Sequence, residues 1–391
     1  MKKSFFLIAA LLTLAACSKV APVEESSNAI SFQVANYVQT KADDAKPGEF
    51  TNEDFGAYAW YSPAEGQREG DPMFANEKVA KSGSEWKTVN NTYYWPKTGT
   101  VDFISYSPYD AEGKQPTVKE SSIAWTKYTV GEKDLMYADK ALKQGANVKT
   151  YYYNGVPTLF RHALAKLSFR VKANFLEWTQ DEIKDEQTGE VLVEKDTTRW
   201  EVSLKSAKLS GIYNTGDLNL TVAADGSWPL PEVGEAKAHV WANPSGAAKE
   251  VELMTAKDSL ILTTKAQDLY TDKDGKAQSF FVLPQALAKD AQKITLVFHI
   301  KTTHIATTDK KEGVGQGTIV IDQDYSKTID LREVSSLAAW QMNQNIVYTI
   351  CIKPTATDPN NPHTDDPEDV VITFDPAQNG WEDVKDATIQ I

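Results

Sequence analysis

A cysteine near the start of the chain stands where a lipid could be attached. Cys17 follows Leu14, Ala15 and Ala16, and an apolar run with two lysines in front of it precedes these residues. A positive start, a short apolar stretch and small residues before a cleavage point are typical of an export signal. We therefore predict that residues 1–16 are removed and that the Cys17 thiol carries acyl chains, including palmitate. An ordinary secretory signal with a chance cysteine is the alternative.

The predicted acylation would decide where the protein is held. Several acyl chains anchor a protein stably, whereas a single chain holds it only marginally. Position 18 is serine rather than aspartate, which, by likeness to enterobacterial lipoprotein sorting, favours the outer membrane. No other apolar run in the sequence approaches the ~18 residues that a membrane-spanning helix needs. We expect a surface-exposed lipoprotein of the cell outer membrane, with residues 17–28 as a flexible tether.

Residues that could catalyse a reaction or hold a metal lack the spacing that such sites need. His299 and His304 lie five positions apart on or near a predicted strand, so spacing alone does not let them share a metal ion. Residues 272–275 begin like a calcium loop, but Lys276 stands where the next ligand should be, which favours a turn. The glycines within 313–317 lack the dinucleotide fingerprint.

Carboxylates are plentiful, but no spacing singles out a pair for acid and base work as in a glycosidase. We therefore predict no cofactor, no metal and no enzyme activity. An exported hydrolase that uses some of these carboxylates is the alternative.

Charge and cysteine content narrow the partners and the sources of stability. The formal net charge is -13 at pH 7, which disfavours nucleic acid and anionic lipid surfaces as partners. The chain has two cysteines, Cys17 and Cys351, so acylation of the first leaves the second without a partner for an intramolecular disulfide. Stability must then come from buried apolar area, and 391 residues are enough for two domains.

Alternation of apolar and polar residues predicts the elements that position any site. A period of two recurs in segments bounded by Gly, Pro, Asn and Asp clusters, which is typical of an all-β sandwich. These segments are 30–34, 167–171, 218–222, 294–300, 346–352, 370–374 and 387–391. The segments 285–292 and 335–344 could form short helices. We predict an all-β fold of antiparallel sandwiches with few short helices.

Composition also divides the chain. We expect an N-terminal β-sandwich over residues 29–157 and a C-terminal one over residues 158–353, and the charged stretch 174–199 predicts a protruding hairpin. Residues 354–369 hold four prolines and five acidic residues, so this stretch cannot join a sheet and forms a flexible loop. Strand-like sequence resumes in residues 370–391, which form a C-terminal appendage.

Aromatic residues are clustered at three places in the sequence. The clusters 60–61, 93–95 and 151–153 each place at least one ring on each face of a strand. They could form a platform that stacks against a glycan or a host ligand. A sandwich core with ordinary edge aromatics is the interpretation that we favour, because strands are rich in aromatics.

Several short segments, in order along most of the chain, resemble the fimbrillin family, the type V pilins and their Mfa-like relatives of Bacteroides-type bacteria. They are the lipoprotein motif ending at Cys17 and the segments 30–42, 55–60, 94–96, 101–108, 134–138, 160–169, 281–287 and 340–350. The resemblance implies two tandem transthyretin-like β-sandwiches. It also implies a structural subunit of a cell-surface pilus, or fimbrium, that mediates adhesion and has other pilus subunits as partners.

The same resemblance implies assembly by donor strand exchange. A protease removes the first strand, and an extended C-terminal segment of a neighbouring subunit fills the groove that is left. Carried over to this chain, the removable strand has its apolar face in Ile30, Phe32 and Val34. The donor strand has its apolar face in Val370, Ile372 and Phe374.

One departure from the family concerns processing. The best-known members are cut after an arginine, but the first arginine here is Arg68, and the corresponding loop offers Lys41 and Lys46. Either a lysine-tolerant protease acts at these candidate sites or the subunit is never cut. An uncut subunit would be a tip, an anchor or a non-polymerising surface lipoprotein that binds a glycan or a host protein.

Overall fold

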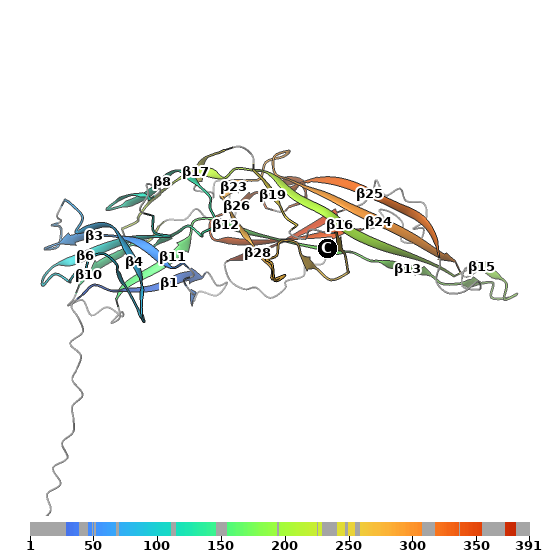
Figure 1. Cartoon of the computed structure of the whole chain (residues 1–391), viewed down its shortest axis with the longest axis horizontal. Coiled ribbons are helices and arrows are strands. Elements are labelled where there is room, and N and C mark those ends of the chain that lie inside the picture. The colour runs from blue at the N-terminus through green and yellow to red at the C-terminus, as the bar shows by residue number, and fades with distance from the viewer. Residues whose placement is uncertain are drawn as a thin grey trace, which may run out of the picture.

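The chain folds into an elongated stack of β-sheets (Figure 1). The computed structural model describes residues 29–38, 46–48, 50, 52–67, 70–110, 115–145, 155–193, 195–224, 226–228, 241–246, 249–254, 259–306, 317–335, 337–353 and 372–380. Nearly all their regular structure is β-strand, and the one helix in these ranges is α1 (Leu331–Val334). The prediction of an all-β fold is confirmed.

Nine strands from the first part of the chain form a sheet that closes on itself. They are β1 (Phe32–Val38), β2 (Lys46–Gly48), β3 (Asp54–Ser62), β4 (Phe74–Ser82), β5 (Glu85–Thr88), β6 (Thr100–Ser107), β9 (Met136–Ala138), β10 (Ala141–Gln144) and β11 (Val156–His162). Their spatial order is β10-β6-β3-β4-β5-β1-β11-β9, with β2 beside β1 and β9 also paired with β6. Because β6 pairs with both β3 and β9, the strands enclose an apolar interior.

A second sheet covers part of the outside of this closed sheet. Its strands are β7 (Thr117–Lys119), β8 (Ser122–Thr129), β17 (Thr215–Thr221) and β18 (Trp241–Ser245), in the order β18-β17-β8-β7. Tyr58 and Trp60 of β3 pack there against Leu218 and Trp241, whereas Phe55 and the alanines of β3 face the enclosed interior. Strands β3 and β6 are therefore buried on both faces. The sequence of β3 is mainly apolar, whereas β6 also buries Asp102, Ser105 and Ser107.

In the other half of the molecule, a five-stranded sheet and a six-stranded sheet share one core. One contains β12 (Ala165–Ala173), β21 (Gln267–Asp268), β22 (Phe280–Val282), β27 (Gln344–Ile352) and β28 (Ile372–Gly380). The other contains β13 (Glu177–Gln180), β16 (Asp196–Ile212), β19 (Lys249–Glu252), β20 (Leu260–Ile261), β24 (Lys293–Ala306) and β25 (Thr318–Asp330). Their facing side chains include Phe169, Tyr348, Trp200 and Phe298.

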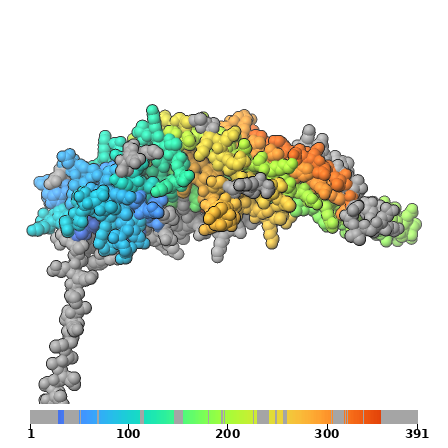
Figure 2. All heavy atoms as spheres, in the orientation of Figure 1, coloured from blue at the N-terminus to red at the C-terminus, as the bar shows by residue number. Residues whose placement is uncertain are grey.

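The long strands β16 and β24 carry one end of the molecule away from the closed sheet (Figure 1). At this end the hairpin of β14 (Ile183–Lys184) and β15 (Val191–Val193) protrudes beyond β13. The space-filling view places the blue-to-cyan N-terminal residues at the opposite end (Figure 2). The prediction of a protruding hairpin within residues 174–199 is confirmed.

Two predicted helices are wrong. Residues 285–292 contain β23 (Gln285–Ala286), and residues 335–344 contain β26 (Ala339–Trp340), which pairs with it. Helix α1 ends at Val334, before the second of these segments begins. Long-range pairing thus outweighs the weak local preference for a helix in both segments.

Most strand pairs are antiparallel, but two are parallel. Strand β1 runs parallel to β11, and β12 runs parallel to β27. The expected arrangement, mostly antiparallel, therefore has two exceptions, in which the long chain between the two strands of each pair lets the second run in the same direction as the first. The domain division at residue 157 stays a prediction. Strand β11 contains this residue, and β17, which follows it in the chain, pairs with β8, which precedes it.

Candidate functional site

The first described strand, β1, lies inside the closed sheet with its apolar face turned to the interior. Ile30 just before it and Phe32 at its start are each only 2% exposed. Val34 is half-buried against the same core, whereas Gln33 between them is exposed. The alternation in the sequence therefore corresponds to one buried and one exposed face.

Aromatic rings line the place that β1 occupies. The ring of Phe32 meets those of Phe55 and Phe103 edge to face, with centroid distances of 5.4 and 5.8 Å. Phe50 stacks on Phe160 of β11 at 4.7 Å. Such aromatic pairs add to the free energy gained by burying their area. Burial of a side chain such as that of Phe32 stabilises the fold by about 1.5–3 kcal/mol.

Backbone contacts hold the start of β1. The Ile30 amide donates to the Tyr93 carbonyl at 2.8 Å, and the Val156 amide donates to the Ser31 carbonyl at 2.8 Å. Gly155 has a φ of +134°, and a Cβ atom there would lie 2.7 Å from the Ser31 oxygen. Only glycine fits this close approach without strain. The backbone at the start of β1 therefore passes so close to Gly155 that a side chain on residue 155 would not fit.

Pairing along the two sides of β1 is unequal. On one side it pairs with β11 over five residues, from Phe32 to Asn36. On the other side its start pairs with β5 at a single position, Phe32 opposite Trp86, and its end pairs with β2. Without β1, the closed sheet would lose the strand that joins β5 to β11.

The other predicted site residues are only partly within the described residues. Cys17, Lys41 and Val370 lie outside them. Lys46 begins β2, where its backbone is opposite Val38 of β1. The acylation and processing assignments stay predictions.

The C-terminal strand β28 lies at the edge of the second half of the molecule. It pairs antiparallel with β27 along its whole length, with Ile372 opposite Ile352 and Phe374 opposite Ile350. Pro376, opposite Tyr348, fits an edge strand because proline has no amide hydrogen to donate to a ladder. A strand-forming segment thus follows the stretch 354–369, and its role as a donor stays a prediction.

The aromatic clusters contribute mainly to the cores. Trp60 is 5% exposed, and Trp95 packs against Phe103 with centroids 5.9 Å apart. Tyr94 is the exception within the cluster 93–95, with 58% of its surface exposed. The cluster 151–153 lies outside the described residues. These positions support the core interpretation for the described rings.

Two buried polar pairs were not anticipated from the sequence, a histidine–aspartate hydrogen bond and a lysine–aspartate ion pair. His162 Nδ1 lies 2.5 Å from Asp134 Oδ2, with both side chains nearly fully buried. Lys140 Nζ lies 3.2 Å from Asp102 Oδ2, also buried. The segments 134–138 and 160–169 were noted only for their family resemblance, and each supplies one member of the first pair. Such pairs across strands leave no local signal, because their partners are distant in sequence.

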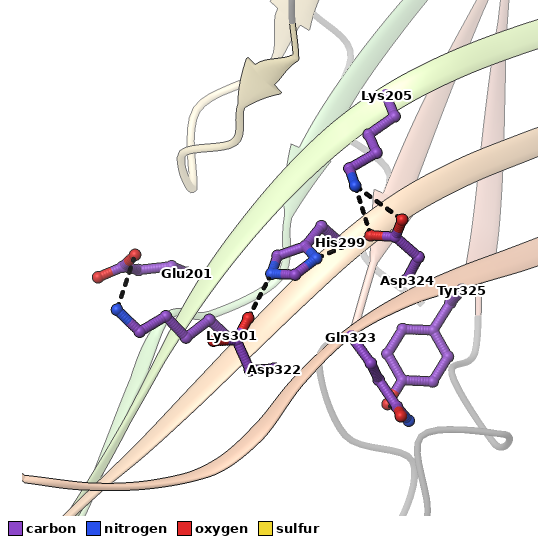
Figure 3. A network of polar contacts seen from close by, with 8 residues as sticks. All are labelled: Glu201, Lys205, His299, Lys301, Asp322, Gln323, Asp324 and Tyr325. Atoms are coloured by element: carbon purple, nitrogen blue, oxygen red, sulfur yellow. Dashed lines mark hydrogen bonds and ion pairs between the residues drawn. The ribbon is translucent and has the colours of Figure 1, made fainter.

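A polar network crosses the exposed face of the long strands (Figure 3). Asp324 of β25 accepts hydrogen bonds from Lys205 Nζ at 2.6 and 2.7 Å, and His299 lies between Asp324 and Asp322. The hydrogen bond from Lys205, followed by that from His299, lowers the pKa of Asp324. These contacts join three neighbouring strands on a solvated face.

Metal-binding residues do not gather in threes or more within the described part of the chain. In the turn at residues 272–275, the Asp272 carboxylate accepts the backbone amides of Asp274 and Lys276 at 2.9 Å, and the prediction of a turn there is confirmed. None of the described helical structure has the length and apolar character to cross a bilayer.

Comparisons with known proteins give a family and a fold. The family model described as fimbrillin-like matches residues 40–366. A fimbrial protein from Bacteroides vulgatus has a similar structure, with a TM-score of 0.52 at 14% identity over 90% of this chain and 99% of that one.

Two further structures resemble the chain more loosely. A protein from Bacteroides uniformis gives 0.42 at 16% identity, over 91% of this chain and 100% of that one. The fimbrial anchor protein Mfa2 from Porphyromonas gingivalis gives 0.28 at 12% identity, over 90% and 98%. No curated protein matches the sequence.

Proposed function

This chain belongs to the fimbrillin-like family, and we propose that it is a structural subunit of an adhesive cell-surface pilus assembled by donor strand exchange. The observation that carries the proposal is the position of β1. Its apolar side chains fill the closed sheet, yet its pairing with β5 is limited to one position. A strand held in this way can be replaced by another with the same alternation of side chains.

The donor in this proposal is the segment that contains β28. Ile372 and Phe374 alternate with polar residues as Ile30 and Phe32 do, and β28 occupies a sheet edge, paired on one side with β27. In the assembled pilus, this segment leaves β27, extends on the Pro/Asp-rich loop 354–369, and takes the place of β1 in the next copy.

The proposal also includes the anchor and the domain arrangement. Acylated Cys17 holds the newly exported subunit at the outer membrane, and cleavage after Lys41 or Lys46 releases both the anchor and β1. The two halves correspond to tandem transthyretin-like sandwiches over 29–157 and 158–353, with β17 and β18 contributing to the first. The core inside the closed sheet is separate from the core of the C-terminal sheets, which supports two halves, and a third core joins residues from both sides of residue 157.

Controlled cleavage tests the function. The chain from Cys17 onward, with Cys17→Ser to remove the acylation site, is nicked with limited trypsin and followed by size-exclusion chromatography and SDS gels. We expect cleavage after Lys41, because Pro47 protects the bond after Lys46 from trypsin, followed by loss of the N-terminal peptide and ladders of multimers. Persistent monomers after complete loss of the peptide would count against a shaft subunit.

Two controls separate assembly from nonspecific association. The double variant Lys41→Gln and Lys46→Gln should resist cutting in this loop and stay monomeric. A chain that ends at Lys353 should be cut but form no ladder, because it lacks the donor. N-terminal sequencing of the native protein completes the test: a start near Ala42 fits a polymerising subunit, and a start at acylated Cys17 fits an uncut tip or anchor.

A further inference from the structure

A cavity of about 180 Å³ opens on the side of the closed sheet that the second sheet covers. Its walls include Tyr106 from β6, Trp125 and Tyr128 from β8, and Leu135 just before β9. Tyr106 and Trp125 pack edge to face with centroids 6.2 Å apart. Three aromatic rings thus form part of the wall beside polar and charged residues, and the volume suits one side chain or another small group.

A bulge in β8 brings two of these rings to one cavity. Trp125 and Tyr128 are three residues apart, so a regular strand would place them on opposite faces. The pairing of β8 with β17 shifts register between these positions, and Lys127 adopts a φ of +50°. The Lys127 amide donates to Asp217 Oδ1 at 2.6 Å, which holds the bulge. A bulge that redirects a side chain is a common feature beside binding sites.

Hydrogen bonds fix the opposite wall. The Tyr106 hydroxyl donates to Asn76 Oδ1 at 2.7 Å and accepts the Asp110 amide at 3.3 Å. This pairing holds the loop that carries Pro108 and Asp110, both of which line the cavity. The wall is therefore set before any ligand arrives.

Negative charge dominates around the aromatic walls. Asp110 and Glu132 line the cavity, with Lys133 as the basic residue among the lining groups. Within the described residues, the exposed Glu132 carboxylate has no polar partner. Two residues further along, the buried Asp134 has its Oδ2 bonded to His162 and its Oδ1 without a hydrogen bond. Burial, followed by the charges of Asp134 and Asp110, raises the pKa of Tyr128 to about 12.

We propose that this cavity binds a protonated amine or guanidinium group on an apolar stem, as carried by a lysine or arginine side chain of a partner protein. Aromatic faces attract such cations, and carboxylates at the rim add to the attraction. The charged head would enter first, toward the aromatic rings and the lining carboxylates of Asp110 and Glu132, and the apolar stem would follow along Pro108. This site does not depend on strand exchange, because none of its residues belongs to β1 or β28.

Binding of matched small molecules tests the proposal. The mature chain with Cys17→Ser is titrated by calorimetry with N-acetyl-lysine methylamide and with its uncharged counterpart N-acetyl-norleucine methylamide. We expect the lysine compound to bind about tenfold more tightly, because it makes a cation–π contact that the uncharged norleucine compound lacks. Equal binding of the two compounds, or no binding of the lysine compound, would overturn the proposal.

Charge variants locate the binding. Glu132→Gln should lower the affinity for the lysine compound about three- to fivefold, and Lys133→Gln should raise this affinity by a similar factor. Both residues are exposed, so neither variant threatens folding. The matched control is Glu186→Gln in the distant hairpin, which should leave the affinity unchanged. Identical affinities for all four proteins would place the binding elsewhere and overturn the assignment.

Two more ligands test whether the cation comes from a free amine or from a protein side chain, and whether the cavity instead binds a neutral sugar. Cadaverine that binds as well as the lysine compound supports a free amine as a sufficient ligand, whereas weaker binding supports a protein side chain. Glucose that binds with an affinity insensitive to Glu132→Gln and Lys133→Gln, while the lysine compound does not bind, would make this a site for a neutral sugar.

Discussion

The ring of Phe32 in β1 meets the ring of Phe103 in β6 edge to face, with their centroids 5.8 Å apart. In the closed sheet, β3, β4 and β5 lie between these two strands on one path around the interior. The contact therefore crosses the enclosed core. Strand β1 is a structural part of the uncut molecule, and its loss must change the stability of the whole closed sheet.

Phe32→Ala should lower the free energy of unfolding by about 3–5 kcal/mol, because it removes a fully buried ring from a packed core. Urea denaturation followed by circular dichroism measures the change. The matched control is Gln33→Ala on the exposed face of the same strand, expected to change stability by less than about 0.5 kcal/mol. Equal effects of the two substitutions would contradict the position of β1 described here.

Gly155→Ala should loosen β1 without touching its side chains. The new Cβ would lie 2.7 Å from the Ser31 oxygen and 2.8 Å from the Phe32 carbonyl carbon, at a φ of +134°. We expect a loss of about 1–3 kcal/mol and faster tryptic cutting after Lys41, three residues beyond the end of β1. Gly70→Ala is the control, since nothing lies within 4 Å of its Cβ position. An unchanged cutting rate would show that β1 tolerates the added methyl group.

The alternation of apolar and polar residues predicted many strands, because it arises where one face of a strand is buried and the other is exposed. The segments 294–300 and 346–352 fall within β24 and β27, each with one face in the shared core. Alternation could not describe β3 and β6, whose second face is covered by β17 and β18 from much later in the chain. The direction of a neighbouring strand is equally absent from local sequence, so the parallel pair β1 and β11 was not foreseen.

Lys140→Met should destabilise the fold by about 3–5 kcal/mol, since it leaves the buried Asp102 carboxylate without its ion-pair partner. Lys140 Nζ lies 3.2 Å from Asp102 and also donates to the Glu120 carbonyl at 2.8 Å. The control is Lys143→Met, whose amine lies 3.2 Å from Glu65 at an exposed site, with an expected change of at most about 1 kcal/mol. Thermal or urea unfolding of both variants distinguishes the two cases.

The pKa of Asp324 should lie below its ordinary value and rise in Lys205→Gln. The lysine hydrogen bond is the main cause of the lowered pKa, followed by that of His299. A lowered carboxyl pKa stabilises the fold above the unfolded-state pKa, and this contribution is lost as pH falls through the folded-state pKa. Carboxyl-carbon NMR titration measures the shift.

Lys301→Gln is the control for this titration, because its amine lies near Glu201 rather than Asp324. It should leave the pKa of Asp324 unchanged. A similar rise in both variants would mean that the general charge of the strand face, rather than the direct hydrogen bond from Lys205, sets the pKa.

The candidate site was only partly accessible to sequence reasoning. The alternation of Ile30, Phe32 and Val34 identified a face that would need burial, since a period of two has one physical meaning in a strand. The rings of Phe50 and Phe160 come from distant segments, so only the folded chain shows that they lie together beside β1. The roles assigned to Cys17, Lys41 and Lys46 rest on motif and resemblance alone.

The cover that β17 and β18 place over Trp60, Tyr106 and Trp125 has a consequence for biosynthesis. A ribosome makes these three rings well before it makes the strands that shield them. During that interval the nascent polypeptide displays a broad aromatic surface with nothing to pack on it, a state prone to aggregation. The aromatic surface is therefore shielded only after residues 215–245 have been made.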